Sequence, residues 1–266
     1  MASKNIDIAI TGAAGRMGQR LVALARADGG FNIVGAVERP DHPAQGKDPG
    51  ELSGIGAIGT PITFDLKKTP KVLIDFTIPP STRHWLKTCR DRKIAMLIGT
   101  TGLQSPDHAA IEQASADIPI LQSPNMSLAV FVLFKLAAQA AKLLGDDYDI
   151  EITETHHRFK KDAPSGTAYE LADSVLKAIG KKRDSLKFGR HGDETTRKPG
   201  EVGMHSLRLG DEVGKHSVFF AALGERLELT HNATNRDTFV HGALRAAKWL
   251  AAQKAGRYTL ADVLGI

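Results

Sequence analysis

Residues 5 to 18 read N-I-D-I-A-I-T-G-A-A-G-R-M-G. The first seven residues alternate polar and apolar side chains, several of them β-branched, which is typical of a strand. Gly12, Gly15 and Gly18 follow, and apolar residues then recur at helical spacing over residues 21–25. The stretch therefore predicts a strand, a glycine turn and a helix.

The glycine turn has the spacing G-x-x-G-x-x-G, a variant of the dinucleotide-binding pattern G-x-G-x-x-G. Glycine lets the backbone approach a pyrophosphate, and a helix N-terminus supplies amide donors. The next predicted strand, residues 31–37, ends at Glu38 and Arg39. Glu38 can accept hydrogen bonds from ribose hydroxyls and Arg39 can hold a 2′-phosphate, so we expect both NADH and NADPH to bind. The alternative is a tight turn without a ligand, which the flanking strand, the helix and Glu38 disfavour.

Further strands and helices alternate along the first half of the chain. Residues 40–60 are expected to form a loop, and Pro79-Pro80-Ser81 is expected to break the chain before a helix. The predicted elements are strands at 72–77, 95–98 and 118–122 and helices at 82–92 and 106–116. They predict an α/β fold with a Rossmann-like, doubly wound parallel sheet, whose ligands bind at the carboxyl ends of the strands. The residues expected there to contact the cofactor are Gly12, Gly15, Arg16, Met17, Gly18, Glu38, Arg39, Phe76, Thr77, Gly99, Thr100, Thr101, Ser123, Pro124, Asn125 and Met126.

A second unit is predicted after a long apolar helix at residues 127–144. It begins with an alternating strand at 148–154, which leads into E-T-H-H-R-F-K-K-D-A-P-S-G-T-A at residues 154–168. His156 and His157 stand at the strand end, and Ser165-Gly166-Thr167 leads into a helix. Backbone amides and cationic side chains converge on anions at such places, so we expect a carboxylate-binding site with an imidazole that moves a proton. A solvated surface loop is the alternative. A metal site is not expected, because the histidines are adjacent and no cysteine pair is present.

The rest of the second unit is predicted to be smaller and of α+β type. A helix at 167–179 is expected to begin with a capping box of Thr167 and Glu170, and residues 181–200 are expected to form a mobile loop. Strands at 204–209, 216–223 and 226–232 are expected to pair antiparallel in a mixed or antiparallel sheet. Residues 218–223 are apolar on both faces, so we expect a helix on one face and another subunit on the other.

The last helix, predicted at residues 237–253, is expected to return to the first domain. The predicted division is a dinucleotide-binding domain at 1–126 plus 237–266, and a substrate-binding and oligomerisation domain at 127–236.

Composition limits the function classes. The 266 residues are 42% hydrophobic and 24% charged, with a formal net charge of +5. These values are typical of a globular protein and suit an anionic small molecule. The basic residues are spread along the chain, so no nucleic-acid partner is expected. Cys89 is the single cysteine, which excludes an intramolecular disulfide. No apolar run is expected to reach membrane-span length, so we expect a cytoplasmic protein with no membrane partner.

Several motifs together resemble one family. They are G-A-A-G-R-M-G (12–18), E-R (38–39), D-F-T (75–77), G-T-T-G (99–102), S-P-N-M-S (123–127), the histidine segment at 154–168, and N-R-D-T-F-V-H-G-A-L-R-A-A-K-W-L (235–250). The chain resembles the 4-hydroxy-tetrahydrodipicolinate reductase (dihydrodipicolinate reductase) family over most of its length. The resemblance implies a Rossmann-like domain and an α+β domain whose sheet builds a homotetramer. It implies the reduction of a small cyclic dicarboxylate by NADH or NADPH in diaminopimelate and lysine biosynthesis.

The resemblance also assigns roles by position. It implies that His156 donates a proton with Lys160 as its partner, and that His157, Lys160, Gly166 and Thr167 contact the substrate. Gly12, Met17, Glu38, Arg39, Phe76, Gly99, Thr101, Ser123 and Met126 are implied cofactor contacts, and Arg236 falls on a position near the cofactor and hinge. Ile78 is a departure, because some members carry arginine there, near the nucleotide.

Two other functions remain open on the residues alone. The first is another nicotinamide oxidoreductase, such as an amino-acid or semialdehyde dehydrogenase, but that gives no reason for the histidine segment. The second is a nucleotide-sensing or DNA-binding regulator, which needs a recognition helix or a basic arm that the sequence lacks.

Overall fold

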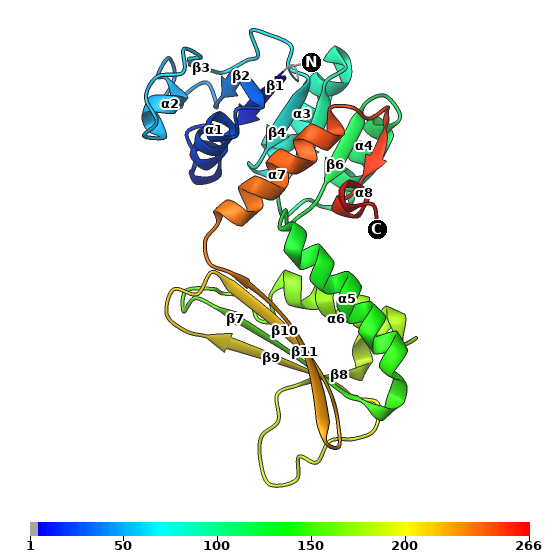
Figure 1. Ribbon diagram of the computed structural model, residues 1–266. Helices are drawn as coiled ribbons and strands as arrows, with labels where there is room; N and C mark the ends of the chain where they lie inside the picture. Colours follow the sequence, from blue (N-terminus) through cyan, green and yellow to red (C-terminus); the bar gives the residue numbers. More distant parts are fainter. Residues whose placement is uncertain (1–4) are drawn as a thin grey trace. The chain divides into compact units, whose positions relative to one another are not determined.

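Strands rich in aliphatic residues form two separate sheets in the computed structural model, which describes residues 5–266 (Figure 1). The larger sheet contains β1 (Ile6–Thr11), β2 (Phe31–Val37), β3 (Ile62–Thr63), β4 (Val72–Asp75), β5 (Ala95–Ile98), β6 (Pro119–Gln122) and β12 (Gly256–Tyr258). Its order is β12-β6-β5-β4-β1-β2-β3, and every neighbouring pair is parallel. The predicted Rossmann-like parallel sheet is therefore confirmed.

Helices cover this sheet, as the apolar strands require. They are α1 (Arg16–Asp28), α3 (Pro79–Arg92), α4 (Ser105–Ser115) and α7 (Asp237–Leu250). Helix α7 packs against α1 and against strands β4, β5 and β6. Ile8, Ile10 and Leu97 are among the fully buried strand residues. Because the strands are parallel, their carboxyl ends lie at one edge of the sheet.

Three expectations for this part of the chain are wrong. Pro79-Pro80-Ser81 does not break the chain but begins α3, since proline fits the first turn, where its missing N–H costs nothing. The expected loop at 40–60 contains the short helix α2 (Pro49–Leu52), which Asp48 caps by accepting from Gly50 N. The last long helix ends at Leu250, and β12 and α8 (Leu260–Leu264), which were not predicted, follow it.

The chain divides into two compact units. Unit 1 comprises the described residues up to Ser127 together with Asp237–Ile266, and unit 2 comprises Leu128–Arg236. Unit 2 holds the second sheet, formed by β7 (Asp149–His156), β8 (Leu186–Phe188), β9 (Val202–Arg208), β10 (Gly214–Ala222) and β11 (Glu225–Ala233). Its order is β11-β10-β7-β9-β8, and it is mixed.

One face of this sheet carries the core of unit 2. Helices α5 (Leu128–Leu144) and α6 (Gly166–Ala178) pack on each other and on the sheet (Figure 1). Ile152, Val218 and Phe220 are fully buried in this core. The predicted second sheet is thus confirmed as mixed.

Several details of unit 2 differ from expectation. Strands β9 and β10 do not pair antiparallel, because β7 lies between them; β9 runs parallel to β7 and β10 antiparallel to it. The expected mobile loop at 181–200 contains β8 and a short 3-10 helix at Arg183–Ser185. Helix α6 has no Thr167–Glu170 capping box: Ser165 is its N-cap and accepts a hydrogen bond from Ala168 N.

Helix α5 continues into a 3-10 turn and is unusually apolar. The helical stretch Leu128–Asp147 is long and apolar enough to cross a membrane by length and composition, which corrects the expectation that no run reaches that length. Its buried side chains, including Val130, Leu133 and Ala137, belong to the core of unit 2. Only one face of the helix is buried in this way, and Val132, Leu136 and Leu143 are exposed.

Candidate functional sites of the two units

The glycine turn lies between β1 and α1 in unit 1. Gly12 has φ +63°, and a Cβ there would lie 2.9 Å from Thr77 Cγ2, so glycine is required. A Cβ on Gly18 would lie 2.0 Å from Gly12 O, which shows how closely α1 packs on the turn. Gly15 is the N-cap of α1, and Arg16 and Met17 are its first helical residues. The first amides of α1 thus stand at the carboxyl end of β1.

Glu38 and Arg39 lie at the carboxyl end of β2. The Glu38 carboxylate accepts a hydrogen bond from Ala14 N at 3.1 Å, which ties it to the glycine turn. The Arg39 side chain is exposed, and its Nε lies 3.4 Å from Asp41 Oδ1. The carboxylate of Glu38 and the guanidinium of Arg39 therefore belong to adjacent residues at the place where the ribose of a dinucleotide would be held.

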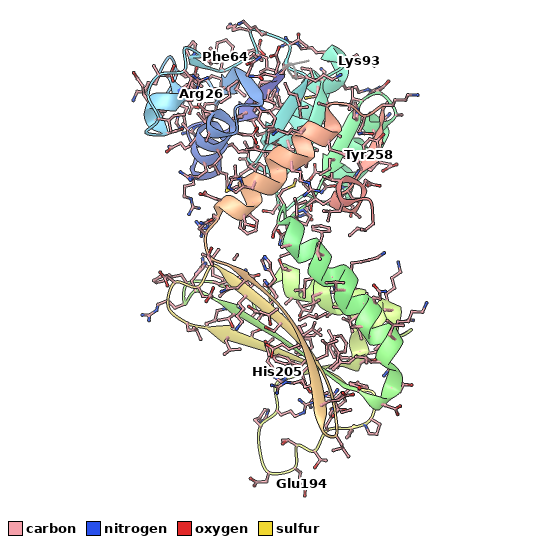
Figure 2. The ribbon with its side chains drawn as sticks, in the orientation of Figure 1. Arg26, Phe64, Lys93, Glu194, His205 and Tyr258 are labelled. Carbon is pink, nitrogen blue, oxygen red and sulfur yellow. The ribbon has the colours of Figure 1, made fainter. Side chains whose placement is uncertain are left out.

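A cavity of about 540 Å³ opens beside these residues. Four of the predicted cofactor residues line it, namely Gly12, Glu38, Arg39 and Thr77. Apolar walls come from Phe64, which is labelled in Figure 2, from Trp85 and from Ile78. The volume and the mixture of apolar walls with a few polar groups fit the adenosine half of a dinucleotide.

Of the predicted cofactor residues outside this cavity, Gly15 to Gly18 begin α1, and those from Phe76 to Met126 lie after β4, β5 and β6. A Cβ on Gly99 would lie 2.4 Å from the Phe76 ring, so the two residues pack tightly. Thr77 N donates to Thr100 Oγ1 at 3.0 Å. Residues after β6 form a turn in which Ser123 Oγ donates to Asn125 O, and Pro124 and the buried Met126 belong to the same segment. Thr101 follows Thr100 after β5 and is exposed. Arg236 is exposed and is the last residue of unit 2.

Behind these loops lies a buried aspartate. Asp75 is 0% exposed, and its carboxylate accepts hydrogen bonds from the hydroxyls of Thr11, Thr77, Thr82 and Thr100. These threonines come from β1, the loops after β4 and β5, and α3. The carboxylate therefore fixes the loops that carry Thr77 and Thr100.

Unit 2 has a candidate site of its own, at the end of β7. His156 Nδ1 lies 2.5 Å from Glu154 Oε2, and Glu154 is completely buried. Arg208, on the neighbouring strand β9, donates to both oxygens of Glu154 at 2.9 and 2.7 Å. Ser165 N donates to Glu154 Oε1 at 3.3 Å. Glu154 thus joins the strand that carries His156 to the N-terminus of α6.

The N-terminus of α6 has an open approach. Gly166 is exposed, and a Cβ there would meet nothing within 4 Å. The Ser165 hydroxyl lies 3.1 Å from Nε2 of the buried His216, whose ring is 5.2 Å from that of His156. Thr167 follows in the first turn. The amides and the dipole at a helix N-terminus favour an anionic group.

Two pKa shifts define the charges around His156 in unit 2. Burial alone would raise the pKa of Glu154, but hydrogen bonds from His156 and Arg208 outweigh it and lower the pKa to about 2. Burial, together with the charge of His156, lowers the pKa of His216 to about 3. Glu154 is therefore an anion and His216 is neutral at neutral pH.

Lys160 and His157 lie in the loop after β7. Lys160 Nζ lies 2.8 Å from Asp162 Oδ1, and its side chain is only 20% exposed, so it is less exposed than a free surface lysine. His157 Nδ1 is buried without a hydrogen-bond partner among the described residues. A buried donor or acceptor without a partner costs free energy, which a polar ligand group can recover. Within residues 5–266, no group of three or more His, Cys, Asp or Glu side chains is placed to hold a metal ion.

The sequence analysis assigned no role to Glu154, Arg208, His216 or Asp75. Glu154 had a usable signal, because it stands two residues before His156 on a strand and so faces the same side. Arg208 and His216 reach the site from strands distant in the sequence, and no local pattern marks them. Asp75 belongs to the D-F-T motif, but the apolar pattern around it predicts only a buried strand.

Comparisons with known proteins agree over both units. A family model described as the N-terminus of dihydrodipicolinate reductase matches residues 6–126, and the model of the C-terminus matches residues 129–264. The chain is 45% identical over 263 residues to the 4-hydroxy-tetrahydrodipicolinate reductase of Anaeromyxobacter dehalogenans, covering 97% of each chain. It is 47% identical over 264 residues to that of Alkalilimnicola ehrlichii, covering 97% of this chain and 98% of the relative.

A solved structure supports the fold. The dipicolinate-bound dihydrodipicolinate reductase from Paenisporosarcina sp. TG-14 matches with a TM-score of 0.75 and 22% identity, covering 96% of this chain and 97% of that one. At this identity the likeness shows that the two chains share the fold.

Proposed function

The chain belongs to the dihydrodipicolinate reductase family, and on that premise we propose which of its residues perform the reaction. The protein is an oxidoreductase that reduces 4-hydroxy-tetrahydrodipicolinate to tetrahydrodipicolinate, a step of diaminopimelate and lysine biosynthesis, with a nicotinamide cofactor. The observation that carries the residue assignment is the contact of Glu154 with both His156 and Ser165 N. It joins a proton donor to an anion-binding helix N-terminus.

His156 is the proton donor in this proposal. The 4-hydroxyl group of the substrate leaves as water, and the dehydrated ring then takes up a hydride and a proton, of which the cofactor supplies the hydride. The imidazolium of His156 gives its proton to the ring carbon that becomes electron-rich, and the ammonium of Lys160 stabilises the negative charge that develops. His157, Ser165, Gly166 and Thr167 hold the carboxylates of the substrate. The free approach to Gly166 and the unpaired Nδ1 of His157 support these roles.

Unit 1 holds the cofactor in this proposal. The amides of Gly12 to Gly18 receive the pyrophosphate, and Glu38 or Arg39 receives the adenosine ribose or its 2′-phosphate. The chain therefore uses NADH and NADPH. The cavity beside Gly12, Glu38 and Arg39 supports this assignment, and the loops held by Asp75 supply Thr77 and Thr100.

Two wider features belong to the same proposal. The protein is a cytoplasmic homotetramer built through the sheet of unit 2. The half-exposed Leu207 and the fully exposed Leu223, on or beside the strands of this sheet, support a contact between copies. Light scattering on the purified protein gives the mass that tests the tetramer.

The experiment that tests the function is a coupled assay. Pyruvate and aspartate semialdehyde with a synthase generate the substrate, and oxidation of NADH or NADPH is followed by the loss of reduced-nicotinamide absorbance. We expect turnover with both cofactors. We expect His156→Gln to lower kcat by about 10² to 10⁴ with unchanged cofactor affinity, which is the usual contribution of a general acid. Unaltered turnover by this variant would remove His156 from the acid role.

A further inference from the structure

We propose that Glu154 and Arg208 are positioning residues that fix the ring of His156 and direct its proton through Nε2. This inference rests on the proposed role of His156 as proton donor. Neither residue is expected to touch the substrate, since Glu154 is completely buried and Arg208 binds it from the adjacent strand. Their effect is therefore exerted through the imidazole.

The ring of His156 has one nitrogen committed to protein. Nδ1 lies 2.5 Å from Glu154 Oε2, and a carboxylate that carries its charge can only accept, so Nδ1 keeps its hydrogen. The low pKa of Glu154 keeps this carboxylate ionised across the range in which enzymes work. The proton that His156 gains and loses is then the one on Nε2.

The side of the ring that bears Nε2 is kept free of side chains by a glycine. A Cβ on Gly214, at the start of β10, would lie 3.1 Å from His156 Nε2 and 3.5 Å from its Cδ2. Gly214 has no positive φ, so its backbone does not require glycine. Gly214 is buried, so any side chain at this position would crowd Nε2 of His156.

Arg208 completes the arrangement. Its guanidinium binds both oxygens of Glu154 and also donates to Asp162 O at 2.7 Å. It therefore fixes the carboxylate and the loop that carries Lys160 at the same time. A buried carboxylate bound on one side by arginine cannot turn away from the imidazole, and its charge is shared between two cations.

The charges around His156 come from every neighbouring element. Glu154 is on β7, Arg208 on β9 and His216 on β10, while Lys160 and Asp162 lie in the loop and pair with each other. His216 is neutral, because burial lowers its pKa to about 3. Glu154 is therefore the anion that stabilises the imidazolium directly, and Arg208 opposes part of its effect.

The test compares two identical substitutions on the same strand. Glu154→Gln removes the charge beside His156. Glu151→Gln is the matched control, because Glu151 pairs with its own histidine and arginine, His205 (labelled in Figure 2) at 2.6 Å and Arg197. The readout is kcat across the pH range with saturating substrate and cofactor, and thermal melting checks the fold of each variant.

We expect kcat to be full at low pH and to fall as pH rises and His156 loses its proton. Without the charge of Glu154 the imidazolium of His156 is less stable. In Glu154→Gln the pH at which kcat falls is therefore lower by about one to two units. Glu151→Gln keeps the wild-type profile. Arg208→Gln removes the opposing cation, so the fall moves to higher pH. Glu154→Asp, which keeps the charge, restores the wild-type position of the profile although kcat is lower.

A measurement on the wild-type protein does not depend on the folding of the Glu154 and Arg208 variants. Solid-state ¹⁵N spectra of histidine-labelled protein distinguish the two neutral tautomers, and comparison with His156→Gln assigns the signal. We expect neutral His156 to carry its hydrogen on Nδ1. A hydrogen on Nε2, or a Glu154→Gln profile equal to that of Glu151→Gln, would overturn the proposal. Wild-type protein without turnover, or His156→Gln with full turnover, would overturn the proposed function instead.

Discussion

The carboxylate of Asp75 lies 2.5 Å from the hydroxyl of Thr82, and both side chains are buried. Three further threonine hydroxyls donate to the same carboxylate. An acidic side chain can be completely buried here because these donors replace water. The cluster connects the ends of three central strands with α3, so it stabilises unit 1 at the place where the cofactor loops begin.

Asp75→Ala is expected to lower the free energy of unfolding by about 3 kcal/mol, because the buried hydroxyls lose their shared acceptor. Urea unfolding followed by circular dichroism measures it. Asp91→Ala, in the same helix as Thr82 but exposed, is the control and should change stability by less than about 0.5 kcal/mol. Equal stability of the two variants would mean that the threonines find other partners at no cost.

The elements that the sequence predicted well are those encoded locally. Residues 5 to 18 contain the strand, the turn and the helix start within one window, and Gly12 has the positive φ that such a turn requires. Buried parallel strands such as β4 and β5 are short continuous apolar runs, so they are easily recognised.

The elements that were missed depend on distant parts of the chain. Strand β12 has three residues and exists because it pairs with β6, so no periodicity marks it. The turn after β9 suggested a hairpin, but β7 takes the place between β9 and β10, and strand order is not a local property. Ser165 and Thr167 both have a hydroxyl of the kind that caps helices. The extended backbone of Ser165 makes it the N-cap.

The same distinction applies to the candidate site. His156, Lys160 and Gly166 belong to one continuous segment, so their proximity could be predicted from the sequence. The side chains that bind this segment from elsewhere, Arg208 and His216, come from β9 and β10. Their roles follow from strand register, which no pattern within the segment encodes.

Gly214→Ala is expected to lower kcat by about tenfold or more with little loss of stability. The added methyl group would lie 3.1 Å from His156 Nε2, which is closer than ordinary contact, while the backbone tolerates alanine. Steady-state kinetics and thermal melting measure the two effects. A Gly214→Ala enzyme with wild-type kcat would show that His156 moves aside freely.

Lys160→Ala is expected to reduce kcat/KM by at least about tenfold and to cost less than about 1 kcal/mol of stability. Its ion pair with Asp162 involves a carboxylate that is 61% exposed, and such pairs contribute little to folding. Lys161→Ala, an exposed neighbour, is the control. A melting temperature that falls sharply while kcat/KM stays constant would assign Lys160 a structural role.

His216 should make the protein sensitive to mild acid. Its pKa is about 3 in the folded protein and about 6.5 in an unfolded chain, so below pH 6.5 the unfolded chain binds the extra proton. The contribution of neutral His216 to the free energy of unfolding is complete above pH 6.5. It is lost as pH falls from 6.5 toward 3, by about 1.4 kcal/mol per pH unit.

The measurement is urea unfolding at pH 7, 6 and 5 for wild type and His216→Gln. The variant should show a shallower loss of stability between pH 6 and 5. The pKa of His231 is also lowered by burial, so His231 contributes to the loss of stability in acid in both proteins. Parallel curves for the two proteins would contradict the buried neutral state of His216.

Ile78→Arg is expected to raise kcat/KM for NADPH relative to NADH by about tenfold. Ile78 is 63% exposed and lines the cavity together with Glu38 and Arg39, so a guanidinium there can bind a 2′-phosphate through charge-assisted hydrogen bonds. Ile55→Arg adds the same charge at an exposed position outside the cavity. If Ile78→Arg and Ile55→Arg gave the same ratio of kcat/KM for NADPH to kcat/KM for NADH, the 2′-phosphate would not bind beside Ile78.

Helix α7 and strand β12 complete the sheet of unit 1, although the ribosome makes them after the whole of unit 2. A nascent chain that has emerged as far as Arg236 contains every residue of unit 2 but still lacks the helix that packs on β4, β5 and β6. Unit 1 therefore cannot be completed until all of unit 2 has been synthesised, although its first strand is at the start of the described chain. The apolar surface that α7 covers has no partner until residues up to Leu250 have left the exit tunnel.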